Sequence, residues 1–319
     1  MAPRRSFLGT AVAGLAAASA RAEETFPTRR VELVVPYAAG GPADRYARVM
    51  AKPLSELWRQ PVVVANRAGG AASIGAAAVA NAAPDGYTLL LASFGLVTNQ
   101  ILLRNLPYSP SDLTPISLAA VGGLVCFAGP RLPVKDAKEL QAYGRANPGA
   151  VRFGSSGNGS TPHIAGELFA ARAGIEMVHV PYRGSGPAMT DLVAGNIDLM
   201  FDPPTTMALV RDGKLRAIAS TGTQRARLAP EVPTMQEMGF DVVARTWYGF
   251  LAPSATPASV QERIVSGVRS LASQEPISKV FLDDDLEPRF SDPGQFRGFL
   301  EGELRHWRDV IRERNIGIE

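Results

Sequence analysis

The sequence repeats one local pattern three times: a short apolar segment, a loop rich in glycine and other small residues, and then the start of a helix. The three loops cover residues 36–44, 154–163 and 181–187. Short apolar runs that alternate with helical patterns indicate βαβ units and a mainly parallel sheet. The carboxyl ends of such strands meet at one crevice. The repeat therefore predicts an α/β fold whose three loops line a single ligand site.

The loop at 154–163, with the sequence GSSGNGSTPH, is the most informative of the three. Glycines allow a ligand to approach the backbone closely. Thr161 is a good N-cap and Pro162 then occupies the first helical position, where its missing N–H does no harm. Free N–H groups at a helix start favour an anion, so we interpret the loop as a carboxylate-binding loop. An ordinary Gly/Ser connection is the alternative for this stretch taken alone.

The first residues have the composition of an export signal. Arg4 and Arg5 precede an apolar run over 7–20, and Ala20-Arg21-Ala22 is an A-x-A cleavage site. We predict a signal peptide over residues 1–22 that is cleaved after Ala22. The arginine pair is also typical of a twin-arginine signal, with a Sec-type signal that carries two arginines as the alternative.

Charge and cysteine content exclude several classes of protein. Removal of residues 1–22 lowers Lys plus Arg from 33 to 30, against 30 Asp plus Glu, so the mature chain is close to neutral. Nothing in this balance favours nucleic acid or an anionic membrane as a partner. The single Cys126 lies in an apolar run and is predicted to be a buried structural thiol. No later apolar run reaches the roughly 18 residues of a membrane span.

The remaining pattern sets the expected elements. Strands are predicted at 31–35, 61–65, 87–92, 124–129, 151–153, 177–181, 197–202, 215–220 and 247–253. Helices are predicted after Asp44 and at 74–81, 136–146, 164–173, 187–194, 259–273, 277–282 and 292–313. We expect Pro53 to kink the first helix or divide it into two pieces.

Motifs for catalysis or metal binding are missing from the sequence. It has no H-E-x-x-H and no Walker loop, and the stretch from Gly154 departs from G-x-S-x-G at its last place. The acidic run at 283–285 lacks further oxygen donors at calcium-loop spacing. We therefore predict no enzyme, no cofactor and no metal site. An exported hydrolase that uses Ser156 and His163 is kept as an alternative, and so is a scaffold protein.

Several motifs together resemble one known family. They lie, in order, at 36–44 (PYAAGGPAD), 60–64 (QPVVV), 84–90 (PDGYTLL), 154–157 (GSSG), 163–169 (HIAGELF), 180–184 (VPYRG) and 195–202 (GNIDLMFD). The set resembles the solute-binding receptors of tripartite tricarboxylate transporters, the Bug receptors. The resemblance spans essentially the whole mature chain.

The resemblance implies a periplasmic binding fold of two α/β lobes with mainly parallel sheets, joined by two crossing strands near 124–128 and 245–251. The first lobe would comprise residues 26–123 plus 246–319, and the second would comprise 124–245. It also implies a periplasmic monomer that binds a small carboxylate and delivers it to the membrane components of a tripartite transporter. Presentation of the ligand to a sensor kinase is a further implied role.

Carried over to this chain, the resemblance and the loop pattern give a set of candidate ligand-binding residues. From the first lobe these are Tyr37, Ala39, Gly40, Gly41, Asp44 and Ser93, and from the second Ser155, Ser156, Gly157, Gly159, Ser160, Thr161, His163, Tyr182, Arg183, Gly184 and Asp202.

Three of these candidates have two interpretations each, and a fourth, Arg183, has one. Asp44 either caps its own helix or pairs with an amine on the ligand. His163 either pins the central loop or contacts ligand. Arg183 is a candidate partner of a distal carboxylate. Asp202 either lines the cleft or closes a structural bond between loops.

Overall fold

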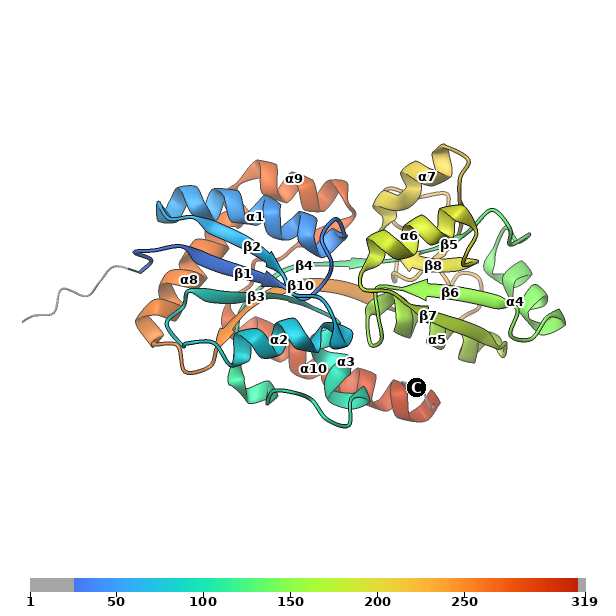
Figure 1. Ribbon diagram of the computed structural model, residues 1–319. Coiled ribbons are helices and arrows are strands. Elements are labelled where there is room, and N and C mark those ends of the chain that lie inside the picture. Colours follow the sequence, from blue (N-terminus) through green and yellow to red (C-terminus); the bar gives the residue numbers. More distant parts are fainter. Residues whose placement is uncertain (1–25, 315–319) are drawn as a thin grey trace, which may run out of the picture.

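The computed structural model describes residues 26–314 and contains two β-sheets side by side, each flanked by helices (Figure 1). The first sheet has the strand order β11-β4-β10-β3-β1-β2, and the second has the order β7-β6-β8-β5-β9. The first is built from β1 (Val31–Val35), β2 (Val62–Asn66), β3 (Thr88–Ser93), β4 (Leu113–Gly123), β10 (Arg245–Pro253) and β11 (Leu286–Pro288). The second is built from β5 (Val125–Ala128), β6 (Val151–Ser155), β7 (Met177–Pro181), β8 (Leu199–Asp202) and β9 (Arg216–Ser220).

Both sheets are mixed. The mainly parallel pairing that the alternating pattern predicts holds only for β1 with β2 and β3, and for β6 with β7 and β8. Antiparallel pairs stand beside them, because β10 runs between β3 and β4 and β5 runs between β8 and β9. In both sheets, the loops that follow the carboxyl ends of the parallel strands lie in the space between the sheets.

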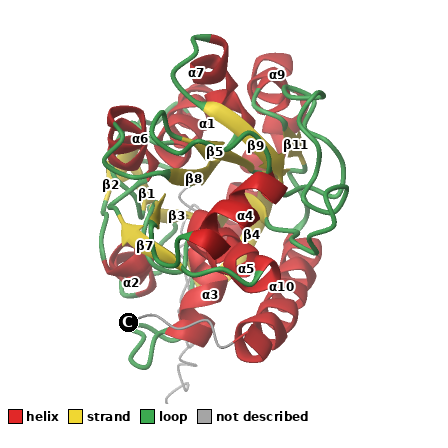
Figure 2. Ribbon diagram, turned by 90° about the vertical axis from the view of Figure 1, so that its right-hand side faces the viewer, coloured by secondary structure: helices red, strands yellow, loops and turns green. Residues whose placement is uncertain are grey.

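The helices cover both faces of each sheet. They are α1 (Pro42–Trp58), α2 (Ser73–Ala80), α3 (Gly95–Leu102), α4 (Ala137–Ala146), α5 (Thr161–Ala173), α6 (Ser185–Ala194), α7 (Met207–Arg211), α8 (Ala258–Ser270), α9 (Glu275–Asp283) and α10 (Pro293–Arg314). In Figure 1, α1 and α9 lie above the first sheet, whereas α2, α3 and α10 lie below it. Figure 2 views the second sheet from its own end, with α6 and α7 on one side and α5 on the other. None of the described helices has the length and apolar content needed to cross a membrane.

Three buried apolar clusters hold these layers together. One lies between the first sheet and α1, α8 and α9, and another between the second sheet and α6. The third continues beneath both sheets and joins side chains of α10 and α3 to side chains of α4 and α5. Phe296 of α10 packs so closely on Gly249 of β10 that a Cβ there would lie 2.3 Å from the ring. Continuous packing of this kind fixes the two sheets relative to each other on their lower side.

The chain passes between the sheets at a buried hydrogen-bonded junction. It leaves the first sheet at Gly123 and enters the second at Val125, and it re-enters the first at Arg245. Thr221 joins the two crossings: its Oγ1 accepts from the Leu124 N–H at 3.0 Å and donates to the Ala244 carbonyl at 2.6 Å. The lobe boundaries given above remain a prediction of which parts of the chain move as units.

Replacement of Thr221 by valine should destabilise the protein by roughly 1–3 kcal/mol, because the Leu124 N–H loses its side-chain acceptor inside a buried junction while the volume barely changes. Urea unfolding measures the difference. The control is Thr190→Val on the exposed face of α6, where Thr190 Oγ1 bonds only a carbonyl of its own helix, and where a change within about 0.5 kcal/mol is expected. Equal losses in the two variants would contradict the importance of the junction.

Some elements differ from the sequence-based prediction. The first helix runs from Pro42 to Trp58 without a break at Pro53, so the predicted division into two pieces is wrong. The N-cap of α5 is Ser160, one residue before the predicted Thr161. β4 and α3 were not predicted at all, and α3 contacts the central loop through Thr98. Cys126 is buried in β5, as predicted.

Candidate ligand-binding site

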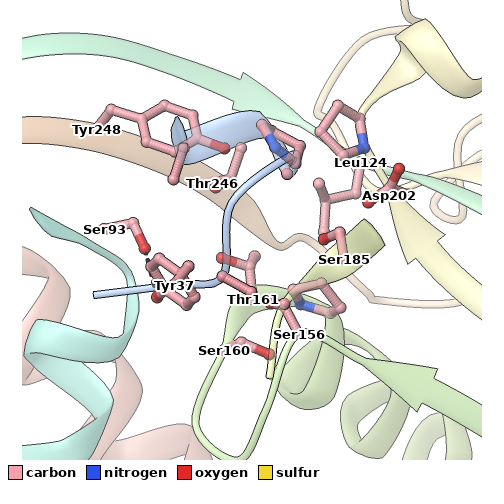
Figure 3. Close-up of a pocket in the computed structure, with 17 residues that line it drawn as sticks. Tyr37, Ser93, Leu124, Ser156, Ser160, Thr161, Ser185, Asp202, Thr246 and Tyr248 are labelled. Atoms are coloured by element: carbon pink, nitrogen blue, oxygen red, sulfur yellow. Dashed lines mark hydrogen bonds between the residues drawn. The ribbon is translucent and has the colours of Figure 1, made fainter. Parts of the chain in front are cut away.

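A cavity lies between the loops of the two sheets, and we call it the central cavity (Figure 3). The empty space among the atoms that line it is about 480 Å³, including solvent at its mouth. Its lining residues are Tyr37, Ala38, Gly41, Pro42, Ala43, Ser93, Leu124, Ser156, Ser160, Thr161, Pro162, Gly184, Ser185, Asp202, Pro203, Thr246 and Tyr248.

The loops that close the cavity touch one another across the gap. The Ala38 N–H in the first loop donates to the Arg183 carbonyl in the third at 3.0 Å. Thr98 Oγ1 of α3 bonds the Gly159 carbonyl in the central loop. A ligand in the central cavity is therefore enclosed by segments from both sheets.

Three helices begin at the wall of the central cavity. They are α1 after Gly41, α5 after Ser160 and α6 after Gly184. The two glycines have no side chain with which to cap the first turn, and the Ser160 hydroxyl donates instead to the Gly157 carbonyl at 2.6 Å. No N-cap side chain of these three helices bonds their first-turn N–H groups. Uncapped helix starts present N–H donors and a positive dipole end, which suit an anion.

Hydrogen bonds within the central loop fix its shape. Ser155 Oγ accepts from the Gly157 N–H at 3.1 Å, and the Gly157 carbonyl accepts from the Ser160 N–H at 3.2 Å. Gly157 has a φ of +125°, a backbone conformation that is essentially restricted to glycine. This geometry places Ser156 and Ser160 at the cavity wall (Figure 3).

Two stacked histidines support the loop from below. His163 Nδ1 accepts from the Gly159 N–H at 3.1 Å, and His179 Nε2 bonds Ser155 Oγ at 2.7 Å. The two imidazole rings stack with centroids 4.0 Å apart. Burial lowers the pKa of His163 to about 4, and burial together with the neighbouring His163 lowers the pKa of His179 to about 3. Both rings are therefore neutral at physiological pH.

The opposite wall is polar but uncharged. The Tyr37 hydroxyl and Ser93 Oγ share a hydrogen bond of 2.7 Å, and Thr246 and Tyr248 of β10 lie beside them (Figure 3). Burial raises the pKa of Tyr37 above its ordinary value, so its hydroxyl stays protonated and can donate. No Lys, Arg or His belongs to the described residues that line the central cavity.

Asp202 is the acidic side chain of the cavity wall. It ends β8 and is 5% exposed. Its Oδ2 accepts from Thr206 Oγ1 at 2.7 Å, whereas its Oδ1 is buried without a hydrogen-bond partner. Burial raises its pKa to about 6, and hydroxyls of Thr206 and Ser185 partly offset this.

The structure brings eight of the predicted site residues to the central cavity. These are Tyr37, Gly41, Ser93, Ser156, Ser160, Thr161, Gly184 and Asp202. A neighbouring hollow, the side pocket, is lined by residues that include Gly157, Tyr182 and Arg183. Arg183 therefore lies beside the cavity rather than in it, and the Tyr182 hydroxyl donates to Asp191 at 2.6 Å.

The other predicted residues line neither pocket. They are Ala39, Gly40, Asp44, Ser155, Gly159 and His163. Asp44 accepts from the Gly40 N–H at 3.0 Å and pairs with Arg48 at 2.9 Å, so its carboxylate holds the first loop. Within the described residues, no group of three or more His, Cys, Asp or Glu side chains is placed to hold a metal ion.

Sequence reasoning missed several lining residues. Ser185 lies in the third glycine-rich loop directly after Gly184, and Thr246 and Tyr248 alternate along β10 with Trp247. Trp247 is fully buried and packs in the core against Phe296. Successive side chains of a strand point to opposite faces of the sheet. Assignment of Trp247 to the core would therefore have placed its neighbours Thr246 and Tyr248 on the cavity side.

The site and fold can now be compared with known proteins. The model for the tripartite tricarboxylate transporter family receptor matches residues 46–316. The chain belongs to this receptor family. Among its relatives, Protein BugT of Bordetella pertussis is 36% identical over 308 residues, which cover 95% of this chain and 94% of BugT. The predicted family is thereby confirmed.

Solved structures of the family share the whole architecture. Rpa4515 of R. palustris, solved with adipate, has a TM-score of 0.88 at 32% identity, covering 92% of this chain and 99% of Rpa4515. MatC from Rhodopseudomonas palustris, solved with bound malate, has a TM-score of 0.85 at 28% identity, covering 90% of this chain and 100% of MatC. The chain thus has the predicted periplasmic binding fold, and it is a solute-binding protein of the Bug type.

Proposed function

We propose that this receptor captures a small carboxylate in the central cavity and delivers it to the membrane components of a tripartite tricarboxylate-type transporter. The observation that carries the proposal is the meeting of three uncapped helix starts at one enclosed cavity. Backbone N–H groups bonded to an ionised oxygen are stronger than neutral hydrogen bonds. Relatives solved with adipate and malate support the same ligand chemistry.

The site suits binding better than catalysis. His163 accepts from the Gly159 backbone, and the serine that bonds a histidine is the buried Ser155, with His179 as its partner. A general base needs a pKa near the working pH, whereas burial holds the pKa of both histidines far below it. The geometry therefore favours a receptor over the alternative hydrolase based on Ser156 and His163.

Export to the periplasm is part of the proposal. Residues 1–22, which carry the predicted signal peptide, lie outside the described residues, and so does its cleavage site. We further propose that the mature receptor works as a monomer. Its recipient is the membrane transporter, with a sensor kinase as a second recipient.

A thermal-shift screen of mature protein stripped of carried-over ligand tests the function. The panel contains mono-, di- and tricarboxylates, amino acids, aromatic acids, sugars and inorganic cations. A ligand at about 100 times its Kd should add roughly 2.7 kcal/mol of stability. We expect at least one carboxylate to raise Tm and sugars to leave it unchanged. A panel in which no carboxylate shifts Tm, or in which a sugar does so instead, would contradict the proposal.

A further inference from the structure

The buried carboxyl group of Asp202 has no cationic side chain beside it in the described part of the cavity wall. Its Oδ1 is buried without a hydrogen-bond partner, its Oδ2 accepts from the Thr206 hydroxyl, and the Ser185 hydroxyl beside it is also neutral. No cationic side chain is among the described residues of the cavity wall. A buried carboxylate without a counter-charge is costly unless something else supplies one. A ligand in the central cavity, which Asp202 borders, can supply that charge.

Asp44, the acid of the first loop, already has a positive partner. Asp44 pairs with Arg48 and accepts from the Gly40 N–H, and it lies outside the cavity lining. A positive group on a ligand would therefore meet Asp202 and not Asp44.

The central cavity has two ends of opposite character. Figure 3 shows Ser156, Ser160 and Thr161 on one side of the cavity and Asp202, with Ser185 next to it, on another. The first end carries the start of α5 and suits an anion. At the second end, the start of α6 at Ser185 already has a carboxylate near it in Asp202. A second ligand carboxylate at that end would be repelled by Asp202.

We propose that Asp202 receives a positively charged nitrogen of the ligand, so that this receptor selects small carboxylates that also carry an amine. The inference rests on the proposed function, since it assumes that a carboxylate occupies the end formed by the central loop. Ligand carboxylate and ligand ammonium would then sit at opposite ends of one cavity. The Asp202 carboxylate would then have a positive partner only in the complex. It would therefore determine which class of carboxylate ligand the receptor binds.

Ligands matched in length test this selection. At six carbons the set is hexanoate, 6-hydroxyhexanoate, adipate, 6-aminohexanoate and norleucine; at four carbons it is butanoate, 4-hydroxybutanoate, succinate, 4-aminobutanoate and 2-aminobutanoate. Isothermal titration at pH 7.5 gives each Kd. In at least one set we expect an amino acid to bind at least tenfold tighter than both the unsubstituted acid and the dicarboxylate.

Two variants assign the preference to one side chain. Asp202→Asn keeps an oxygen that can accept from Thr206 and should remove the preference for the amine while improving the binding of dicarboxylates. Asp212→Asn, on the exposed turn after α7, is the matched control and should leave every Kd within about twofold. A thermal melt of each variant reports whether it folds.

Two results would overturn the inference. One is a dicarboxylate or hydroxy acid that binds as tightly as the best amino acid of its set. Another is an unchanged preference in Asp202→Asn. If carboxylates with and without an amine bind with the same affinity, the inference fails and the proposed function stands. If the broad panel of the thermal-shift screen contains no carboxylate ligand, the proposed function fails as well.

Discussion

Substitution of Gly157 by valine should weaken carboxylate binding by at least about a hundredfold while the protein stays folded. Gly157 has a φ of +125°, and a Cβ at this position would lie 3.1 Å from the Tyr182 carbonyl. A non-glycine residue in this region costs roughly 1–3 kcal/mol. The loop can relieve that cost only by moving Ser156 and Ser160 off the cavity wall. Loss of one or two hydrogen bonds to a charged group, at about 1.5–3 kcal/mol each, gives the expected loss in affinity.

Gly239→Val is the matched control for this prediction. Gly239 also has a positive φ, of +89°, and an added Cβ would meet no atom within 4 Å. It lies on an exposed turn outside both pockets. Calorimetric titration should therefore give a wild-type Kd for Gly239→Val despite a comparable fall in stability. An unchanged Kd in Gly157→Val would show that the central loop does not hold the ligand.

The stacked histidines should make the fold sensitive to acid. Both have a folded pKa below the unfolded value of about 6.5, at about 4 for His163 and about 3 for His179. Below pH 6.5 the unfolded chain therefore binds protons that the folded chain does not, so stability falls as the pH drops. Asp202 acts in the opposite direction, because its folded pKa of about 6 exceeds its unfolded value.

Urea unfolding at pH 7.5 and pH 5 measures this effect. Substitution of His179 by glutamine removes one of the two titrations and leaves Asp202 in place. The loss of stability between the two pH values should be smaller in His179→Gln than in wild type by roughly 1–2 kcal/mol, with the partial exposure of His179 taken into account. His306→Gln, on the exposed side of α10, should keep the wild-type pH dependence. An identical pH dependence in wild type and His179→Gln would contradict the assignment.

The glycine-rich loops were the part of the site that sequence reasoning could predict. Their strand–loop–helix pattern depends on neighbours along the chain, and Tyr37, Ser156 and Gly184 do line the central cavity. The division between lining and supporting residues was not accessible in this way. Ser155 and Ser156 are adjacent and alike, yet Ser155 turns under the loop to His179 while Ser156 faces the cavity.

Elements that depend on tertiary context were missed. β4 contains Pro115, which argues against a strand on local grounds. In the structure Pro115 lies at a register shift opposite Leu251 of β10, where the ladder is already irregular. α3 begins at Gly95, shortly after the strand predicted at 87–92, in a stretch for which no helix was predicted. Its buried Thr98 reaches the Gly159 carbonyl of the other sheet's loop, a contact that no local pattern indicates.

The lack of a cationic side chain beside Asp202 could not be predicted from the sequence either. The sequence placed it at the end of a strand and left open whether it lines the cleft or bonds another loop. The first is observed, because Asp202 lies in the cavity wall, whereas its bond to Thr206 joins residues only four apart in one segment and links no second loop. The absence of a positive side chain among the described residues around it depends on which segments meet there, and only the folded chain determines that.

One comparison tests the central claim most directly: the affinity of the mature receptor for its best carboxylate ligand against its affinity for the primary amide of the same acid. The two molecules differ little in shape, but only the acid brings an ionised oxygen to the uncapped helix starts. Isothermal titration should show the acid binding at least tenfold more tightly than the amide. An amide that binds as well as the acid would contradict carboxylate capture at these helix starts.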